Sequence, residues 1–355
     1  MEFNINSDTL GSILKNVTYI VSGINEKSLL ARMLIEVSNN KVVFSLSNST
    51  DRAIIKLPCQ AIQEGRVYTT ASKFIALIQS LSGEISIKLV GNEISITQSH
   101  LCVKLPIISD SSGLFNGINI NQPFNDCGKI DGSVLAKATN ITTPFVNVVN
   151  NTSPTKGVCI KANVKDIKLM SCNGAIMSFF SHPLDQSASM LHTLRVETLT
   201  AVSRIFGEEK DVSIASTPSG VKISGQNCEI YASVLQGTYP PLQKIIENGF
   251  VYSFTLDKAT LEHSLKCISI VKTPSKRLEI DCCDKTINLR YESHFVEKLI
   301  DENATGDNVR IFVDYELLWS ALKAADCATP TFKITLSIKL YIMGKNSLII
   351  IAPQQ

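Results

Sequence analysis

The sequence lacks the features that carry a chain into or across a membrane. None of its apolar runs approaches the ~18–20 residues that a membrane-spanning helix needs. The opening MEFNINSDTLGSILKN has no basic stretch followed by an apolar one, so no secretory signal is predicted. Hydrophobic residues make up 44% of the chain and charged residues 19%, which suits packed cores rather than disorder. We therefore expect a cytoplasmic, globular protein with no membrane partner.

Disulfide and metal-binding patterns are also missing. The ten cysteines are scattered and form no CxxC motif, and the five histidines show no metal-ligand spacing. Most of the cysteines lie in apolar stretches, where a reduced thiol behaves as a small hydrophobic side chain. We predict reduced cysteines, no metal and no cofactor, with metal or redox use as the alternative.

The common catalytic signatures are absent as well. The sequence contains no GxxxxGK[ST], no GxGxxG after a strand, no HExxH and no GxSxG. Weak acidic pairs, such as Glu208 and Glu209, lie at expected turns and are interpreted as solvated surface rather than acid/base groups. With 34 basic and 32 acidic residues, the net charge of +2 also excludes a polycation. No catalytic residue is predicted, and an enzyme remains only a minor alternative.

What the chain does contain is an internal repeat. The stretch that begins at Phe3 matches the stretch that begins at Phe254, and a fainter copy begins at Ile130. In each copy a short apolar strand leads into a helix whose expected N-cap is Asn6, Asp131 or Asp257. The first helix places Leu10, Ile13, Leu14 and Val17 on one face, the third places Leu261, Leu265 and Ile268, and the second has the weaker set Leu135 and Ala138.

A second strand and helix follow in every copy, together with alternating strands bounded by turns. Gly91 and Asn92 predict the turn of a hairpin, and Gly344 predicts a turn between the strands at 332–336 and 347–351. Hairpins are also expected between the strands at 212–214 and 221–223 and between those at 278–280 and 287–289. The fold class is therefore predicted to be α+β, with three units of one kind. Each unit has two helices on antiparallel sheets, over residues 1–120, 121–247 and 248–355.

Four segments carry a resemblance to a known family. They are FNINSDTLGSILKNV at the start; VYTTASKFIALIQSL with the later GNEISIT and VKLP; the strand pair around Gly157 and Gly174; and LQGTYP, which ends at Pro240. In this order they resemble the beta subunit of bacterial DNA polymerase III, the beta sliding clamp family, over essentially the whole chain. The resemblance implies three tandem DNA-clamp domains and a homodimer closed head-to-tail into a ring. It also implies that strand Ser99–Leu105 pairs with the other copy near Ile268–Val271.

The function implied by the resemblance is non-enzymatic. The ring would encircle double-stranded DNA without reading its sequence, and would tether the replicative polymerase. The polymerase and the clamp loader would dock through short peptide motifs. A tandem β-rich scaffold protein that does not encircle DNA is the alternative.

The resemblance also implies two sets of site residues. The peptide-binding pocket would contain Thr155, Gly157, Cys172, Gly174, Ile176, Met177, Pro240, Lys244, Ile245, Ile350, Ile351, Ala352, Pro353 and Gln354. The cations that face DNA would be Lys15, Lys73, Lys137, Arg204, Lys258, Lys266 and Lys272. The alternatives are ordinary domain packing for Ile350 and Ile351, and the solvated face of an amphipathic helix for each cation. The turn at 172–176 lacks the histidine and arginine typical of the family, which leaves the preferred partner motif open.

Overall fold

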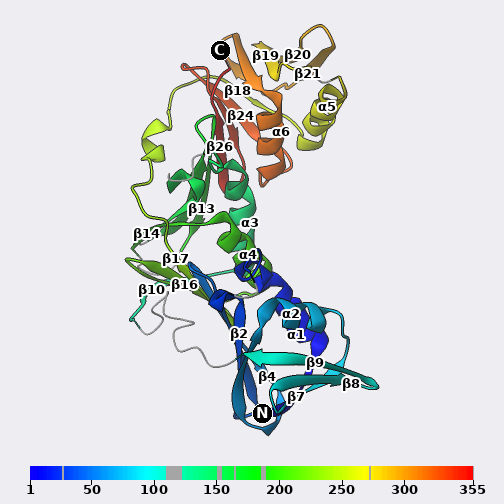
Figure 1. The fold of residues 1–355 in the computed structure, drawn as a ribbon. Coiled ribbons are helices and arrows are strands. Elements are labelled where there is room, and N and C mark those ends of the chain that lie inside the picture. Colours follow the sequence, from blue (N-terminus) through cyan, green and yellow to red (C-terminus); the bar gives the residue numbers. More distant parts are fainter. Residues whose placement is uncertain are drawn as a thin grey trace. The chain divides into compact units, whose positions relative to one another are not determined.

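The computed structural model describes residues 1–25, 28–108, 122–149, 154–163, 165–184, 189–271 and 273–354. The chain divides into two compact units. Figure 1 shows the helices and strands of both, coloured along the sequence. Unit 1 contains Met1–Ala136 and Glu197–Val234, and unit 2 contains Lys137–Leu184, Ser189–Val196 and Leu235–Gln355. The border between the two units follows the hydrogen-bonded sheets, and it is a different division from the three predicted repeats. The boundaries at 120/121 and 247/248 therefore stay a prediction.

Six α-helices and five short 3-10 helices occur in the described part of the chain. The α-helices are α1 (Ser7–Val17), α2 (Ala71–Gln79), α3 (Gly132–Thr142), α4 (Val196–Phe206), α5 (Lys258–Ile270) and α6 (Tyr315–Ala324). The 3-10 helices are η1 (Thr18–Ile20), η2 (Leu29–Ala31), η3 (Thr143–Phe145), η4 (Pro154–Lys156) and η5 (Leu242–Ile245). None of these helices is long and apolar enough to cross a membrane.

Unit 1 is built on one sheet of 13 strands, in the order β10-β15-β16-β17-β4-β3-β2-β6-β9-β8-β7-β1-β5. The strands are β1 (Glu2–Asn6), β2 (Arg32–Ser38), β3 (Lys41–Ser47), β4 (Asp51–Pro58), β5 (Gln60–Gln63), β6 (Gly65–Thr70), β7 (Glu84–Val90), β8 (Glu93–Gln98), β9 (Leu101–Ile108), β10 (Asn125–Ile130), β15 (Val212–Thr217), β16 (Gly220–Ser224) and β17 (Cys228–Ser233). The antiparallel pair of β17 and β4 joins the middle repeat to the first.

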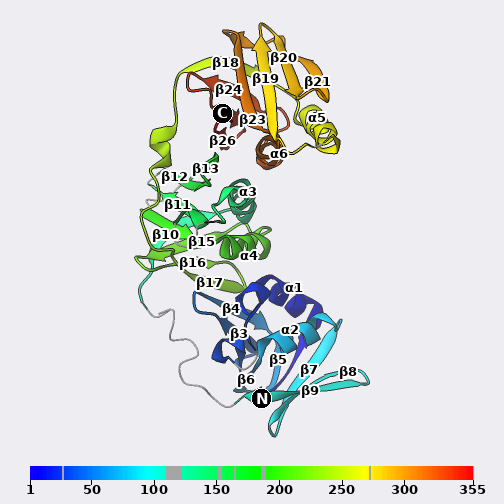
Figure 2. The ribbon, with the colours of Figure 1, turned by 45° about the horizontal axis from the view of Figure 1, so that its top comes forward.

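Unit 2 has a sheet of 9 strands, in the order β14-β11-β12-β13-β26-β25-β24-β18-β22, and a sheet of 4 strands, in the order β21-β20-β19-β23. The strands are β11 (Val158–Ala162), β12 (Asp166–Cys172), β13 (Ile176–Pro183), β14 (Met190–Leu194), β18 (Phe250–Thr255), β19 (Arg277–Cys283), β20 (Thr286–Tyr291), β21 (Phe295–Ile300), β22 (Thr305–Gly306), β23 (Val309–Asp314), β24 (Thr331–Thr335), β25 (Leu340–Met343) and β26 (Ser347–Ile351). Figure 2 shows the smaller sheet with α5 beside it. Here the antiparallel pair of β13 and β26 joins the middle repeat to the last.

The predicted helix caps are confirmed. The Asn6 side chain accepts hydrogen bonds from the backbone N–H groups of Asp8 and Thr9 at 3.0 and 3.1 Å. Asp131 accepts from the N–H of Ser133 at 2.8 Å, and Asp257 accepts from the N–H of Thr260 at 2.8 Å. Each cap pairs a backbone donor that the first helical turn would otherwise leave unsatisfied.

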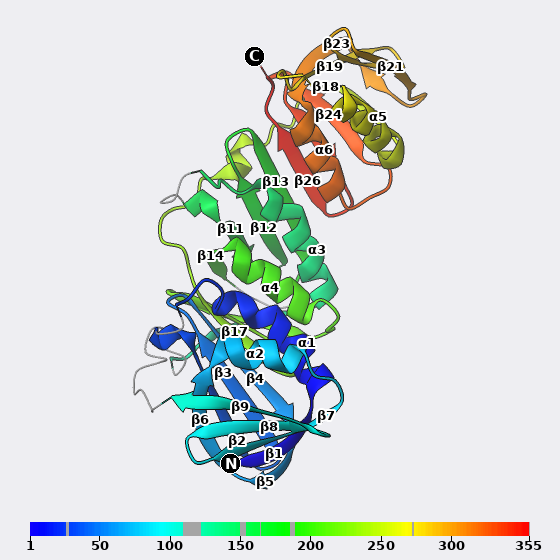
Figure 3. The same ribbon diagram turned by 45° about the vertical axis from the view of Figure 1, so that its right-hand side comes forward.

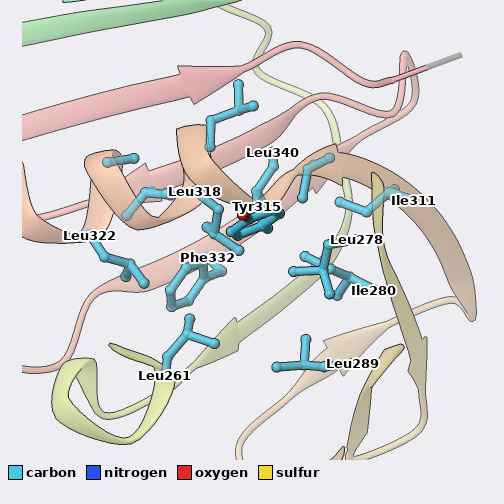
Figure 4. Close-up of a cluster of buried hydrophobic side chains, with 14 of the residues drawn as sticks. Leu261, Leu278, Ile280, Leu289, Ile311, Tyr315, Leu318, Leu322, Phe332 and Leu340 are labelled. Carbon is cyan, nitrogen blue, oxygen red and sulfur yellow. The ribbon is translucent and has the colours of Figure 1, made fainter. Parts of the chain in front are cut away.

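The predicted apolar stripes face the sheets. Leu10, Leu14 and Val17 of α1 are buried, while Ile13 is half-buried. In unit 2, α5 and α6 lie on the same side of their sheets (Figure 3) and share one core with the strands beneath them. Figure 4 shows this core, which includes Leu261, Leu278, Ile280, Leu289, Ile311, Tyr315, Leu318, Leu322, Phe332 and Leu340.

The hairpin predictions are confirmed in three places and wrong in one. β7 and β8 pair across Gly91 and Asn92, and the pairs β15–β16 and β19–β20 form as expected. The strands β24 and β26, however, do not pair across Gly344. The unpredicted strand β25 lies between them and pairs with both. Its four residues are too few for a clear period-2 pattern, which is why the sequence did not reveal it.

Gly132, in the first turn of α3, offers a test of this packing. A Cβ atom there would meet the backbone carbonyl oxygen of Phe206 at 1.7 Å, so Gly132→Ala should lower the free energy of unfolding by about 1–3 kcal/mol. Chemical denaturation measures this change. Gly249→Ala is the matched control, because nothing lies within 4 Å of its added Cβ. Equal stability of the two variants would contradict the close approach.

Candidate functional site

The predicted pocket residues all lie within unit 2, on segments that the sheet brings together. β13 and β26 pair antiparallel, so that Ile176 faces Ile351 and Met177 faces Ile350. The chain then continues past the end of β26, where the N–H of Ala352 donates to the carbonyl of Ala175 at 2.8 Å. The turn before β13 therefore lies beside the C-terminal tail.

The loop after β17 closes over the same region. The N–H of Leu235 donates to the carbonyl of Thr193 at 2.8 Å, and the Tyr239 hydroxyl lies 3.5 Å from the carbonyl of Gly157. Gly157 has no room for a side chain, since an added Cβ would meet the Leu194 carbonyl at 2.4 Å. The loop ends in η5, which buries Leu242 and leaves Lys244 and Ile245 exposed.

These segments enclose an apolar cluster, which we call the site floor. It consists of the buried residues Cys159, Met170, Cys172, Phe179, Leu242, Tyr341 and Ile350, with Met177, Tyr239, Ile246 and Leu348 partly buried against it. Three predicted site residues, Cys172, Met177 and Ile350, belong to this floor. Successive residues of a strand point to opposite faces, so Ile176 and Ile351 instead lie in the large core of α5 and α6.

The other predicted residues surround the floor. Gly174 and Pro240 are exposed, and so is Ile245 at 39%. Thr155 is buried, whereas Ala352, Pro353 and Gln354 are half-buried along the tail. The exposed members of the set are therefore the ones that an incoming ligand can reach directly.

The turn that bears Gly174 is shaped by its own side chains. The Asn173 side chain accepts hydrogen bonds from the N–H groups of Ala175 and Ile176, each at 3.1 Å. Gly174 has a φ of 97°, in the left-handed region that favours glycine. Asparagine followed by glycine therefore suffices for the turn without the histidine and arginine of the family pattern.

The site floor carries no charge at neutral pH. Burial raises the pKa of the Cys159 thiol to about 11 and also raises the pKa of Cys172. Burial likewise raises the pKa of the Tyr239 hydroxyl well above its ordinary value. Protonated thiols are poor nucleophiles, so this surface is suited to binding apolar groups and not to covalent chemistry.

An ion pair beside the floor was not predicted from the sequence. The Lys339 ammonium bonds the Glu247 carboxylate, which also accepts from the Ser337 hydroxyl at 2.6 Å. The N–H of Glu247 donates to the hydroxyl of Tyr341, a floor residue, at 2.8 Å. Glu247 and Lys339 are 92 residues apart in the sequence, and no local pattern signals their contact.

The cations predicted to face DNA lie on helices in both units. Lys15, Lys73 and Arg204 belong to unit 1 and are exposed; Lys137 and Lys266 belong to unit 2 and are also exposed. Lys258 differs, because its ammonium donates to the carbonyls of Lys323 and Ala325 at 3.3 and 3.0 Å. Its charge thus complements the C-terminus of α6, which weakens the case for a DNA contact. Lys272 lies outside the described residues.

All ten cysteines are free thiols. Among the described residues, no group of three or more histidine, cysteine, aspartate or glutamate side chains is placed to hold a metal ion.

Comparisons with known proteins agree on one family, although no protein-family model matches the chain. The "Beta sliding clamp" of Treponema pallidum is 22% identical over 331 residues, which cover 88% of this chain and 82% of that protein. The protein of the same name from Chlamydia muridarum is 19% identical, over 78% of this chain and 75% of its own length.

Solved structures match over the full length. The DNA polymerase III beta chain of Streptococcus pneumoniae has a TM-score of 0.88 at 18% identity, covering 100% of this chain and 99% of that one. The sliding clamp of Pseudomonas aeruginosa, solved with griselimycin, has a TM-score of 0.91 at 13% identity, with 100% and 99% covered. The Helicobacter pylori beta clamp, solved with a DNA ligase peptide, has a TM-score of 0.86 at 15% identity and covers 100% of both chains.

The Glu247 contact predicts a defined pH dependence. Its hydrogen bonds to Lys339 and then Ser337 lower its pKa from 4.5 to about 2, so they stabilise the fold above pH 4.5 and are lost as the pH falls to about 2. The stability advantage of the wild type over Glu247→Gln should therefore shrink across this range in denaturation curves.

Glu302→Gln is the control for this measurement. Glu302 also contacts a lysine, at 2.8 Å, but its side chain is 75% exposed, and such pairs contribute little to stability. A pH-independent difference between the wild type and Glu247→Gln would rule out the proposed role of this carboxylate.

Proposed function

We propose that this chain, a diverged homologue of the beta sliding clamp (the beta subunit of DNA polymerase III), acts as a processivity clamp that encircles duplex DNA. The family is that of a non-catalytic polymerase accessory subunit. The observation that carries the proposal is the full-length match, with TM-scores of 0.88 and 0.91, of six helices on antiparallel sheets. On this proposal, residues 1–120, 121–247 and 248–355 are three clamp domains of one kind.

The electrostatics suit a ring that slides. Duplex DNA carries about one charge per 1.7 Å of its axis, and lysine and arginine bind its phosphates without reading sequence. The net charge of +2 is too small for tight nonspecific binding by the whole surface. Exposed helix cations, such as Lys15, Lys137 and Arg204, would supply local and loose contacts. Retention would then come from encirclement rather than from affinity.

A second copy of the chain would close the ring. β21 is an edge strand of the four-stranded sheet, and its Val296 and Ile300 side chains are 69% and 62% exposed. At the end of α5, Ile270 is 77% exposed and Val271 is 39% exposed, whereas Ile268 is buried in the core. An exposed edge strand beside apolar side chains is a template for pairing with another chain. These features support the predicted head-to-tail contact with strand Ser99–Leu105 of the other copy.

Partner proteins would bind at the site floor and its rim. The Helicobacter pylori beta clamp, which shares this fold, was solved with a DNA ligase peptide. In this chain, Met177 and Tyr239 are partly accessible above a buried apolar floor, and Ile245 is exposed beside them. Such a surface suits the apolar side chains of a short peptide. The proposed partners that carry such peptide motifs are the polymerase and the clamp loader.

The alternative function is a scaffold that does not encircle DNA. Measurements of mass and of retention on circular and cut DNA distinguish it from a clamp. Light scattering should give the mass of two chains, and the protein should stay on circular duplex DNA in moderate salt but dissociate once the circle is cut. A linear molecule has ends over which a ring can slide, whereas a scaffold has no dependence on ends. A single-chain mass, or equal retention on circular and cut DNA, would contradict the proposal.

The peptide site has its own test. Ile245→Asp should weaken binding of the DNA ligase peptide, measured by fluorescence anisotropy, by about tenfold or more, because it places a charge on an apolar contact surface. Ile62→Asp is the control, since Ile62 is 57% exposed but belongs to unit 1. A wild-type chain that does not bind this peptide, or an equal loss with both variants, would contradict the proposed site.

A further inference from the structure

Two metal-ligating side chains lie one turn apart on the solvent-facing side of α5. The Nε2 atom of His263 and the Sγ atom of Cys267 are 3.9 Å apart. His263 is exposed and Cys267 is half-buried. Residues at i and i+4 of a helix share one face, which is the arrangement by which helical side chains chelate a single metal ion.

The helix holds this pair rigidly. Asp257 caps its N-terminus, and Leu261, Leu265 and Ile268 are buried in the large core of unit 2. The opposite face is thereby fixed towards solvent, and the backbone positions of His263 and Cys267 cannot separate without unwinding the helix. A ligand pair on a fixed element loses little conformational freedom when it binds an ion.

The distance matches the chemistry of a zinc-type ion. Zinc binds imidazole nitrogen at about 2.0–2.1 Å and thiolate sulfur at about 2.3 Å, so two ligands at near-tetrahedral angles lie roughly 3.5–3.8 Å apart. The measured 3.9 Å needs only a small side-chain adjustment. A nitrogen and a sulfur together favour borderline or soft metals over Mg²⁺ and Ca²⁺.

We propose that His263 and Cys267 form an exchangeable two-ligand site for Zn²⁺ or a similar divalent transition metal. No cluster of three or more His, Cys, Asp or Glu side chains occurs in the part of the chain that the structure describes, so water completes the coordination. On binding, the Cys267 thiol releases its proton to solvent, and the thiolate and the neutral imidazole donate to the ion. The site does not depend on the proposed clamp function.

Cobalt titration of the full-length, fully reduced chain tests the site without DNA. Binding of Co²⁺ should produce a thiolate-to-cobalt charge-transfer band at one ion per chain, and added Zn²⁺ should abolish it. Cys267→Ser should remove the band. His263→Gln should weaken binding by at least about tenfold, since even the loss of an outer-shell partner costs 10–100-fold.

Cys102→Ser is the matched control, because Cys102 is the exposed cysteine of the chain and lies on β9 of unit 1, whereas α5 belongs to unit 2. Its band should equal that of the wild type. Circular dichroism of each variant reports whether α5 and the rest of the fold are retained. Absence of a band in the wild type, or its loss in Cys102→Ser with retention in Cys267→Ser, would overturn the site. Neither result would affect the retention test on circular DNA.

Discussion

Backbone pairing across the joints between repeats is the interaction on which the rest of this structure depends. β17 pairs with β4 over five residues on each strand, and β13 pairs in the same way with β26. Each joint satisfies a row of N–H and C=O groups that would otherwise form an open sheet edge. The first joint is reinforced by a buried contact, in which the Thr198 hydroxyl donates to the Asp51 carboxylate at 2.6 Å. The residues of the predicted middle repeat, 121–247, therefore belong partly to unit 1 and partly to unit 2.

The second joint also builds the candidate peptide site. Pairing of β13 with β26 places the 172–176 turn beside the C-terminal tail, although about 180 residues separate them in the sequence. Alternation along β26 then divides its side chains, so that Ile350 enters the site floor and Ile351 enters the core of α5 and α6. The same strand thus supports both a binding surface and a core. This is why Ile351 and Ile176 are accounted for by packing alone.

The neutral, apolar character of the site floor results from burial of its side chains more than from nearby charges. Its Cys159 and Cys172 thiols and the Tyr239 hydroxyl stay protonated because burial disfavours their anions. The nearby Glu247 carboxylate is neutralised by its ion pair with Lys339. A neutral, sulfur-containing floor of Cys159, Met170, Cys172 and Met177 is polarisable and adapts to the shape of an apolar side chain. The adjoining turn at 172–176 lacks the histidine and arginine of the family pattern.

The sequence by itself determined the local elements: the caps at Asn6, Asp131 and Asp257, the apolar stripes, and most hairpins. These elements depend on residues that are close together in the sequence, so a sequence pattern records them directly. Only the tertiary structure decided that β25 lies between β24 and β26. It also decided that Lys258 donates hydrogen bonds at the C-terminus of α6 and that Glu247 forms an ion pair with Lys339. Each of these depends on which strand or helix lies alongside, a choice made by backbone pairing and core packing between segments far apart in the chain.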